Sequence, residues 1–202
     1  MSSSNKAIAT LVSDHLGGCL LPEGFRALRA REYGRQIGQI VQRVLLEGRG
    51  VSGARSTYLV YFAHPVCRPP LLTGFSAGAR LDDHPWDLST PEAARQSLPE
   101  IAGRVTHVVI PWMRATATLE GLAERLAGAR GAHPQPRSFE LAVIATMRGS
   151  LAEARRLLAD VVKGPLPFWS GPDSPARQLL EAIETSTQAT LLSAWEAATA
   201  PR

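Results

Sequence analysis

The stretch Thr57-Tyr58-Leu59-Val60-Tyr61-Phe62 decides the fold class of this 202-residue chain. It is aromatic and β-branched almost throughout, a composition that favours a β-strand. Both of its faces are apolar, which is typical of a strand in the middle of a sheet with a layer on each side. The sequence on either side of it is therefore expected to supply the neighbouring strands.

Three further segments fit that sheet. Phe25–Ala30 is a short strand candidate, and Leu71–Arg80 is a weaker one. The spacing of apolar residues in Ile37–Leu46 fits a helix as well as a strand, but the β-branched content favours a strand. The glycine-rich stretch Glu47–Gly53 is expected to be a flexible turn. Together these segments predict an antiparallel meander over about residues 25–80.

The rest of the chain has helical periodicity. We expect helices at residues 5–20, 89–112, 119–126, 139–147, 151–162 and 174–195, with loops at 128–136 and 163–173. Gly17-Gly18 should weaken the end of the first helix, and Pro99 should kink or restart the second. Caps are expected from Ser89, Ser150 and Ser174, with Glu92 and Glu153 closing capping boxes. Strands followed by helices predict an α+β fold, with an α+β domain at 1–127 and a helical extension at 137–202, or one domain overall.

Bulk composition excludes several classes of protein. The hydrophobic content is 45%, the net charge is +4 and the pI is about 9.6. No apolar run is long enough to span a membrane, and the N-terminus lacks a signal-peptide core, so we expect a cytoplasmic protein. The two cysteines, Cys19 and Cys67, are too few for a disulfide scaffold. Arginine supplies nearly all the positive charge, which the codon bias of a GC-rich bacterial genome explains without nucleic acid.

Candidate catalytic residues are few. The Gly48–Gly53 stretch has the glycines of a nucleotide-binding loop, but a strand follows where a helix should begin. We therefore expect a hairpin turn there, and we expect the protein to bind no cofactor. His64, Cys67, Asp83 and His84 are the only grouping that would suit an enzyme of unfamiliar type, and their spacing matches no closed zinc site. The Asp82–Asp87 stretch fits a turn that docks Trp86 into the core better than a metal site.

A cluster of arginines with interleaved tyrosines is the main candidate for a binding surface. Its members are Arg26, Arg29, Arg31, Arg35, Arg43, Arg49 and Arg55, with Tyr33, Tyr58 and Tyr61. Such a sheet can bind an acidic protein partner or single-stranded nucleic acid. Solvent-facing arginines can also serve only to prevent the edge of the sheet from pairing with another strand. The binding residues that we predict are Arg26, Arg29, Arg31, Arg43, Tyr58, Arg80 and Trp86.

Four features in order resemble the bacterial family of domain of unknown function 4304. They are Gly24-Phe25-Arg26 after a short helix, the glutamine-bearing Ile37–Gln42, Arg80 followed by the Trp86 segment, and a long helix running into Ile110-Pro111-Trp112. The resemblance covers about residues 6–127. It departs from the pattern after Trp86, where Asp87 stands in place of a second Trp. It implies strand rather than helix at 37–46 and an uncharacterised cytoplasmic accessory protein rather than an enzyme.

The leading hypothesis is thus a non-catalytic protein-interaction module, of the immunity or adaptor type by analogy with small α+β partners of bacterial toxins. A nucleic-acid-binding protein and an enzyme of unfamiliar type are the alternatives. The last helix has a face that fits either its own sheet or a second copy, so the oligomeric state is left open.

Overall fold

The computed structural model describes residues 3–51, 54–69, 77–81, 85–129 and 133–199. It divides into two compact units. Unit 1 comprises Met1–Ile37, Val41–Ala63 and Gly78–Ala115, and unit 2 comprises Gly38–Ile40, His64–Ala77 and Thr116–Arg202.

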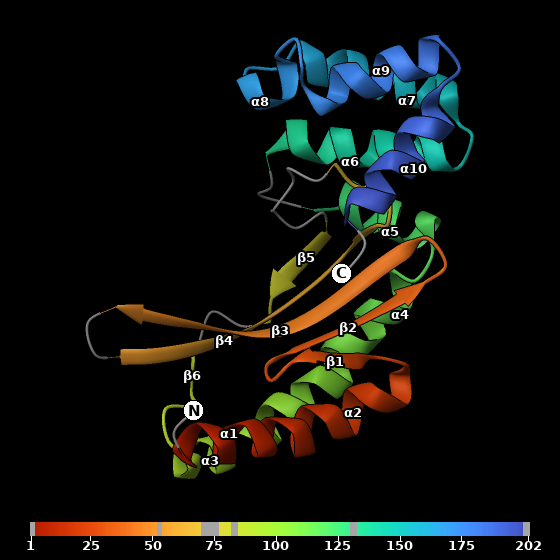
Figure 1. The fold of residues 1–202 in the computed structure, drawn as a ribbon. Coiled ribbons are helices and arrows are strands. Elements are labelled where there is room, and N and C mark those ends of the chain that lie inside the picture. Colours follow the sequence, from red (N-terminus) through yellow and green to blue (C-terminus); the bar gives the residue numbers. More distant parts are fainter. Residues whose placement is uncertain (1–2, 52–53, 70–76, 82–84, 130–132, 200–202) are drawn as a thin grey trace. The chain divides into compact units, whose positions relative to one another are not determined.

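The sheet confirms the expected α+β class. Its strands lie in the order β1 (Arg26–Arg29), β2 (Glu32–Ile37), β3 (Ile40–Val51), β4 (Ala54–Pro65) and β5 (Ala77–Arg80), and β6 (Trp86–Asp87) pairs with β4. The long hairpin of β3 and β4 dominates it (Figure 1). Its turn, at residues 52–53, lies outside the described residues, as does most of the Leu71–Arg80 candidate.

Apart from a turn at Gly38 and Gln39, the ambiguous segment 37–46 is extended, as its β-branched content favours. Gly38, with a φ of +51°, makes the turn that separates β2 from β3, and a positive φ is a conformation that glycine adopts at little cost. The sequence prediction missed β2 as a separate strand, because its glycine, arginine and glutamine leave it without an apolar alternation.

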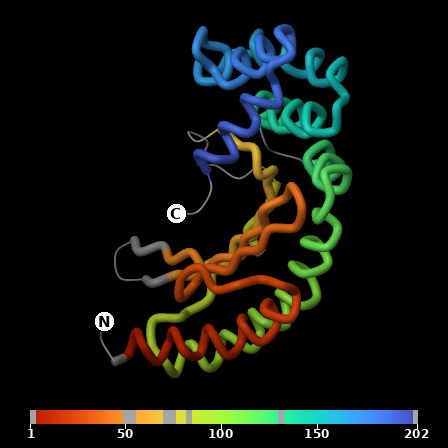
Figure 2. Tube along the Cα trace, turned by 45° about the vertical axis from the view of Figure 1, so that its right-hand side comes forward, coloured from red at the N-terminus to blue at the C-terminus, as the bar shows by residue number. Residues whose placement is uncertain are grey.

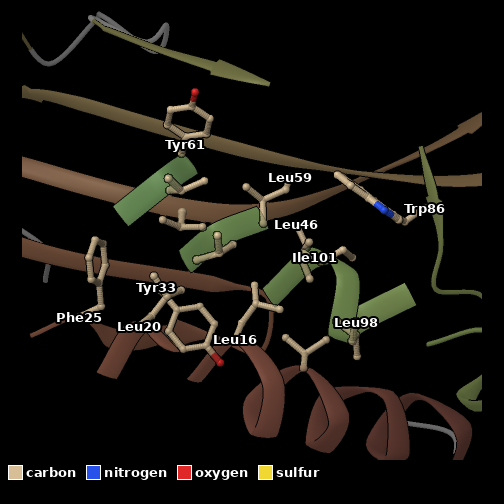
Figure 3. Close-up of a cluster of buried hydrophobic side chains, with 14 of the residues drawn as sticks. Leu16, Leu20, Phe25, Tyr33, Leu46, Leu59, Tyr61, Trp86, Leu98 and Ile101 are labelled. Atoms are coloured by element: carbon tan, nitrogen blue, oxygen red, sulfur yellow. The ribbon is translucent and has the colours of Figure 1, made fainter. Parts of the chain in front are cut away.

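Two long helical segments cover one face of the sheet in unit 1. The first runs through α1 (Ser3–Val12), a π-helical turn (Ser13–Gly17), α2 (Gly18–Leu20) and a 3₁₀ turn (Leu21–Glu23). The second runs through α3 (Pro91–Arg104), a π-helical turn (Val105–Val109) and α4 (Ile110–Ala115). Figure 2 shows α1 and α3 side by side against the sheet. Their apolar stripes meet Val44, Leu46 and Leu59 in a core whose members are 0 to 7% exposed (Figure 3).

The first helix runs through Gly17 to Leu20, as expected, and a Cβ added at Gly17 would make an ordinary contact with the hydroxyl of Tyr33 at 3.4 Å. Two other local expectations for these helices are wrong. The second helix does not restart at Pro99, which lies inside α3. Its cap is Thr90, whose side chain accepts a hydrogen bond from the backbone N–H of Ala93, rather than Ser89.

Unit 2 contains most of the remaining helices. They are α5 (Leu119–Ala127), α6 (Pro134–Met147), α7 (Leu151–Val162), α8 (Pro167–Ser170), α9 (Pro175–Glu184) and α10 (Gln188–Thr199). The α6–α7 hairpin and the Ser174 cap were expected, but the Ser150 side chain makes no capping hydrogen bond. The expected last helix is two, separated at Ser186, which has a φ of 59°. The 163–173 loop contains α8, and α5 is part of this unit.

Candidate protein-binding face

The alternation of side chains along a strand sorts the arginine cluster onto two faces of the sheet. Tyr33, Val44 and Leu59 point into the core of unit 1. Their neighbours along the strands, such as Glu32, Arg43 and Tyr58, therefore point the other way. We call this second surface the outer face. Its charged and half-buried members are Arg26, Leu28, Arg29, Glu32, Val41, Arg43, Leu45, Glu47, Tyr58, Arg80 and Asp87, and its buried members on β4 are Val60 and Phe62.

Strand β1 brings two arginines to the outer face. Arg26 is paired in register with Gly34 of β2, and directly opposite residues of an antiparallel pair share a face. The Leu28 side chain lies over the same glycine, within 2.7 Å of where a Cβ would be. After a bulge, Arg29 stands opposite Glu32, with 85% of its side chain exposed and its Nε 3.8 Å from the carboxylate. Arg26 and Arg29 thus present nearly free guanidinium groups at this edge.

The middle of the outer face is less polar. Arg43 forms an ion pair with Glu32, and both side chains are partly exposed. Beside them on β3, Val41 and Leu45 are half-buried. At the other side of the sheet, the Arg80 guanidinium stacks over the ring of Tyr58 at 4.1 Å from its centroid, an orientation that a cation–π interaction favours.

Arg35 belongs to the inner side, which sequence reasoning missed. Its side chain is 8% exposed, stacks on Phe25 at 4.5 Å and donates from Nε to Gln42 Oε1 at 2.8 Å. Gln42 is fully buried, and its Nε2 donates to the carbonyl of Met113 at 2.6 Å. These contacts join strands β2 and β3 to helix α4. A glutamine inside an otherwise apolar strand was the available signal, because a buried amide needs partners.

Glu23 extends this polar network to the surface. Its carboxylate accepts hydrogen bonds from Arg114, with Nη2–Oε1 at 2.6 Å and Nε–Oε2 at 3.3 Å, and lies near Arg35. The hydrogen bond from Arg114 is the main reason that the pKa of Glu23 is lowered. The network therefore stabilises the inner side of the sheet, and it does not add charge to the outer face.

Several predicted binding residues lie elsewhere. Trp86 is 7% exposed and packs in the core of unit 1, and Arg31 lies in the turn between β1 and β2, where its carbonyl accepts a hydrogen bond from the N–H of Leu46. Tyr33 and Tyr61 are also buried, and Tyr61 packs edge-on against Trp112. The side chains of Arg49 and Arg55 lie outside the described residues. The predicted binding residues that do lie on the outer face are Arg26, Arg29, Arg43, Tyr58 and Arg80.

The His64 and Cys67 grouping does not form an activated nucleophile. Burial is the main reason that the pKa of the Cys67 thiol is raised to about 11, and the Glu196 carboxylate, 3.9 Å away, raises it further. The thiol is therefore neutral near pH 7, whereas a cysteine nucleophile needs a thiolate. The next residue, Arg68, pairs with Glu140 at 3.7 Å in a nearly buried ion pair of unit 2. Asp82, Asp83 and His84 lie outside the described residues.

Within the described ranges, no group of three or more His, Cys, Asp or Glu side chains is arranged to hold a metal ion. Nor does any described helix have the length and apolar character needed to cross a membrane. No family model, curated protein or solved structure matches the chain. The resemblance to domain of unknown function 4304 stays a prediction.

Proposed function

We propose that this protein is a non-catalytic protein-interaction module, of the immunity or adaptor type and cytoplasmic, whose outer face binds an acidic protein partner. The observation that carries the proposal is the arrangement of exposed Arg26, Arg29 and Arg80 around the half-buried Leu45 and Tyr58. Arginine and tyrosine are enriched at the centres of protein interfaces, and a less polar middle with a charged rim is the usual anatomy of one.

Charge complementarity supports an acidic partner. The outer face carries four arginines and three carboxylates, Glu32, Glu47 and Asp87, of which Glu32 is engaged by Arg43. Carboxylates on a partner would pair with Arg26, Arg29 and Arg80, whose side chains are already exposed and need little rearrangement.

The same geometry weakens the nucleic-acid alternative. Binding of single strands commonly uses exposed aromatic rings on which bases stack. Tyr33 and Tyr61 are buried, and Arg80 already occupies one face of the Tyr58 ring. Glu32 also places a carboxylate among the arginines, where it would repel phosphates.

The test is an affinity capture from the native host with matched variants. The wild-type chain is compared with the triple variant Arg26→Glu/Arg29→Glu/Arg80→Glu and with a control, Arg95→Glu/Arg156→Glu, whose side chains are 60% and 67% exposed on helices. We expect one stoichiometric acidic protein that the wild type and the control retain and the triple variant loses. That protein is then purified and titrated against each variant at two salt concentrations.

Two results would overturn the proposal. One is a partner that binds the triple variant as tightly as it binds the wild type. The other is a gel shift of single-stranded DNA or RNA at low salt that the triple variant loses, with affinity falling steeply as salt rises. The second result would instead support the nucleic-acid alternative.

A further inference from the structure

We infer that the C-terminal helix α10 exchanges between two copies of this chain, so that each α10 packs on unit 2 of the other copy. The inference is independent of the proposed function and begins from the turn at Thr185–Thr187, between α9 and α10. Short turns under strain are the places where a terminal element opens and docks on a neighbouring copy. This turn is short, and two unfavourable features lie in it or next to it.

The first unfavourable feature is a serine at a position that favours glycine. The N–H of Thr187 donates to the carbonyl of Ala182 at 2.7 Å, and the N–H of Ser186 donates to that of Ile183 at 3.4 Å. These two bonds form a Schellman motif, in which the left-handed residue is usually glycine. Ser186 takes that position with a φ of 59°, and among the described residues no other except glycine has a positive φ. Its Cβ therefore strains the turn.

The second unfavourable feature is at the first residue of α10. Gln188 Oε1 is buried, and the structure gives it no hydrogen-bond partner. A buried acceptor without a partner costs free energy, because it has given up its hydrogen bonds to water. Gln188 directly follows the turn, so its surroundings change when the turn opens. We expect opening to return this oxygen to water.

The sequence of the turn is compatible with a continuous helix. No glycine or proline occurs in residues 176–200, and the apolar spacing predicts a single helix there. In the structure, α10 instead turns away from the direction of α9 and lies beside α6 (Figure 1). If the turn became helical, the 12 residues of α10 would extend about 18 Å beyond the end of α9. They would then be placed to reach a second copy.

The surface that α10 covers in its own chain identifies the occupant, because α10 of a second copy has the same sequence. Leu192 and Trp195 are buried, and the ring centroids of Trp195 and Phe139 of α6 are 6.3 Å apart. Thr199 Oγ1 also donates to the carbonyl of Val66 at 3.3 Å. Exchange restores each of these contacts between copies, so they favour neither form. The turn and the entropy of association therefore set the balance.

The experiment measures the mass of the full chain in solution over a range of concentrations, by light scattering after size exclusion. We expect monomer and dimer, with a dimer fraction that rises with concentration. Ser186→Gly relieves the positive φ and disfavours a continuous helix, so it should raise the dissociation constant of the dimer at least about tenfold. Gln188→Leu removes the buried acceptor and should act in the same direction. Thr185→Ala/Ser186→Ala/Thr187→Ala favours the helix and should lower the constant by at least about tenfold.

A matched control separates the turn from the helix itself. Thr190→Ala/Ser193→Ala changes two exposed positions of α10 and raises its helix propensity without touching the turn. This control should leave the dissociation constant unchanged. Thermal melts identify any variant that fails to fold. Ser186→Gly and Gln188→Leu act on different features, so one folded variant of the two suffices.

A distance within one chain distinguishes exchange from simple association. Spin labels are attached at Gln178→Cys on α9 and Ala198→Cys on α10, in a chain whose two native cysteines are replaced by alanine. Labelled chain is mixed with an excess of unlabelled chain, and the dimer is isolated for pulsed electron paramagnetic resonance. A continuous helix places the two labelled positions about 30 Å apart. The monomer, in which the turn is closed, should give a shorter distance.

Three results would overturn the inference. One is a wild-type chain that stays monomeric at the highest concentration reached. Another is a dimer in which the distance between the labels is the same as in the monomer. The third is a folded Ser186→Gly or Gln188→Leu variant that dimerises as readily as the wild type.

Discussion

Replacing Gln42 by leucine should destabilise unit 1 substantially without changing the outer face. The substitution removes the hydrogen bond from Nε2 to the Met113 carbonyl and the one that Oε1 accepts from Arg35. A neutral hydrogen bond contributes about 0.5–1.5 kcal/mol and one to a charged group about 1.5–3 kcal/mol. Added together, the loss in the free energy of unfolding should be roughly 2–4 kcal/mol, because Gln42 is fully buried and water does not replace either bond.

Native-state hydrogen exchange with mass spectrometry is the suitable assay, since it reports on peptides of β3 and β4 separately from unit 2. Gln42→Glu is the informative companion, because it keeps an acceptor for Arg35 but cannot donate to the Met113 carbonyl. Gln96→Leu, at an exposed position of α3, is the matched control and should change protection little. If Gln42→Leu lowers the opening free energy of β3 by less than about 0.5 kcal/mol, the polar network does not hold the sheet to α4.

Three further outcomes are expected. Folding raises the pKa of Cys67 to about 11, so the neutral thiol contributes stability that is complete below pH 9 and is lost as the pH rises toward 11. The rate at which a thiol reagent modifies Cys67 between pH 7 and pH 11 measures this pKa, and rapid modification near pH 7 would refute the raised value. Gly164→Ala should destabilise unit 2 by about 1–3 kcal/mol, because the new Cβ would lie 2.5–2.7 Å from the Gln135 amide. A midpoint of urea unfolding that does not change would contradict this prediction. The hydrogen bond from Arg114 lowers the pKa of Glu23, so the ionised carboxylate contributes stability that is present above about pH 4.5 and is lost as the pH falls below that value. Glu23→Gln should therefore make the free energy of unfolding less dependent on pH in this acid range.

The sequence predicted the strands and helices better than their ends. The apolar run at Thr57–Phe62 correctly indicated a central strand, because packing on both faces leaves a continuous signature. Helix interruptions were harder to place. Pro99 was expected to kink or restart the second helix and lies inside α3, whereas Thr185–Thr187 was expected to be helical and separates α9 from α10.

The arginine-rich composition predicted a binding surface on the sheet, but it did not predict which of the arginines lie on that surface. Arg26, Arg29 and Arg43 lie on the outer face, yet Arg35 has the same chemistry and lies on the inner side. A shift of one residue in strand register would exchange these faces. Register is set by the buried partners on the neighbouring strands, and a single sequence with an unrecognised β2 does not reveal them.

The assignment of Arg35 to the inner side also changes the electrostatic argument for function. If every arginine of the cluster faced solvent, the surface would resemble the basic track of a nucleic-acid-binding protein. Instead Arg35 and its neighbour Glu23 hold the inner side of the sheet to α4, and Glu32 engages Arg43 on the outer face. What is left is exposed Arg26, Arg29 and Arg80 at the two sides of the outer face, with half-buried Leu45 and Tyr58 between them. That distribution suits a partner that brings both carboxylates and an apolar surface, which a protein has and a phosphate backbone lacks.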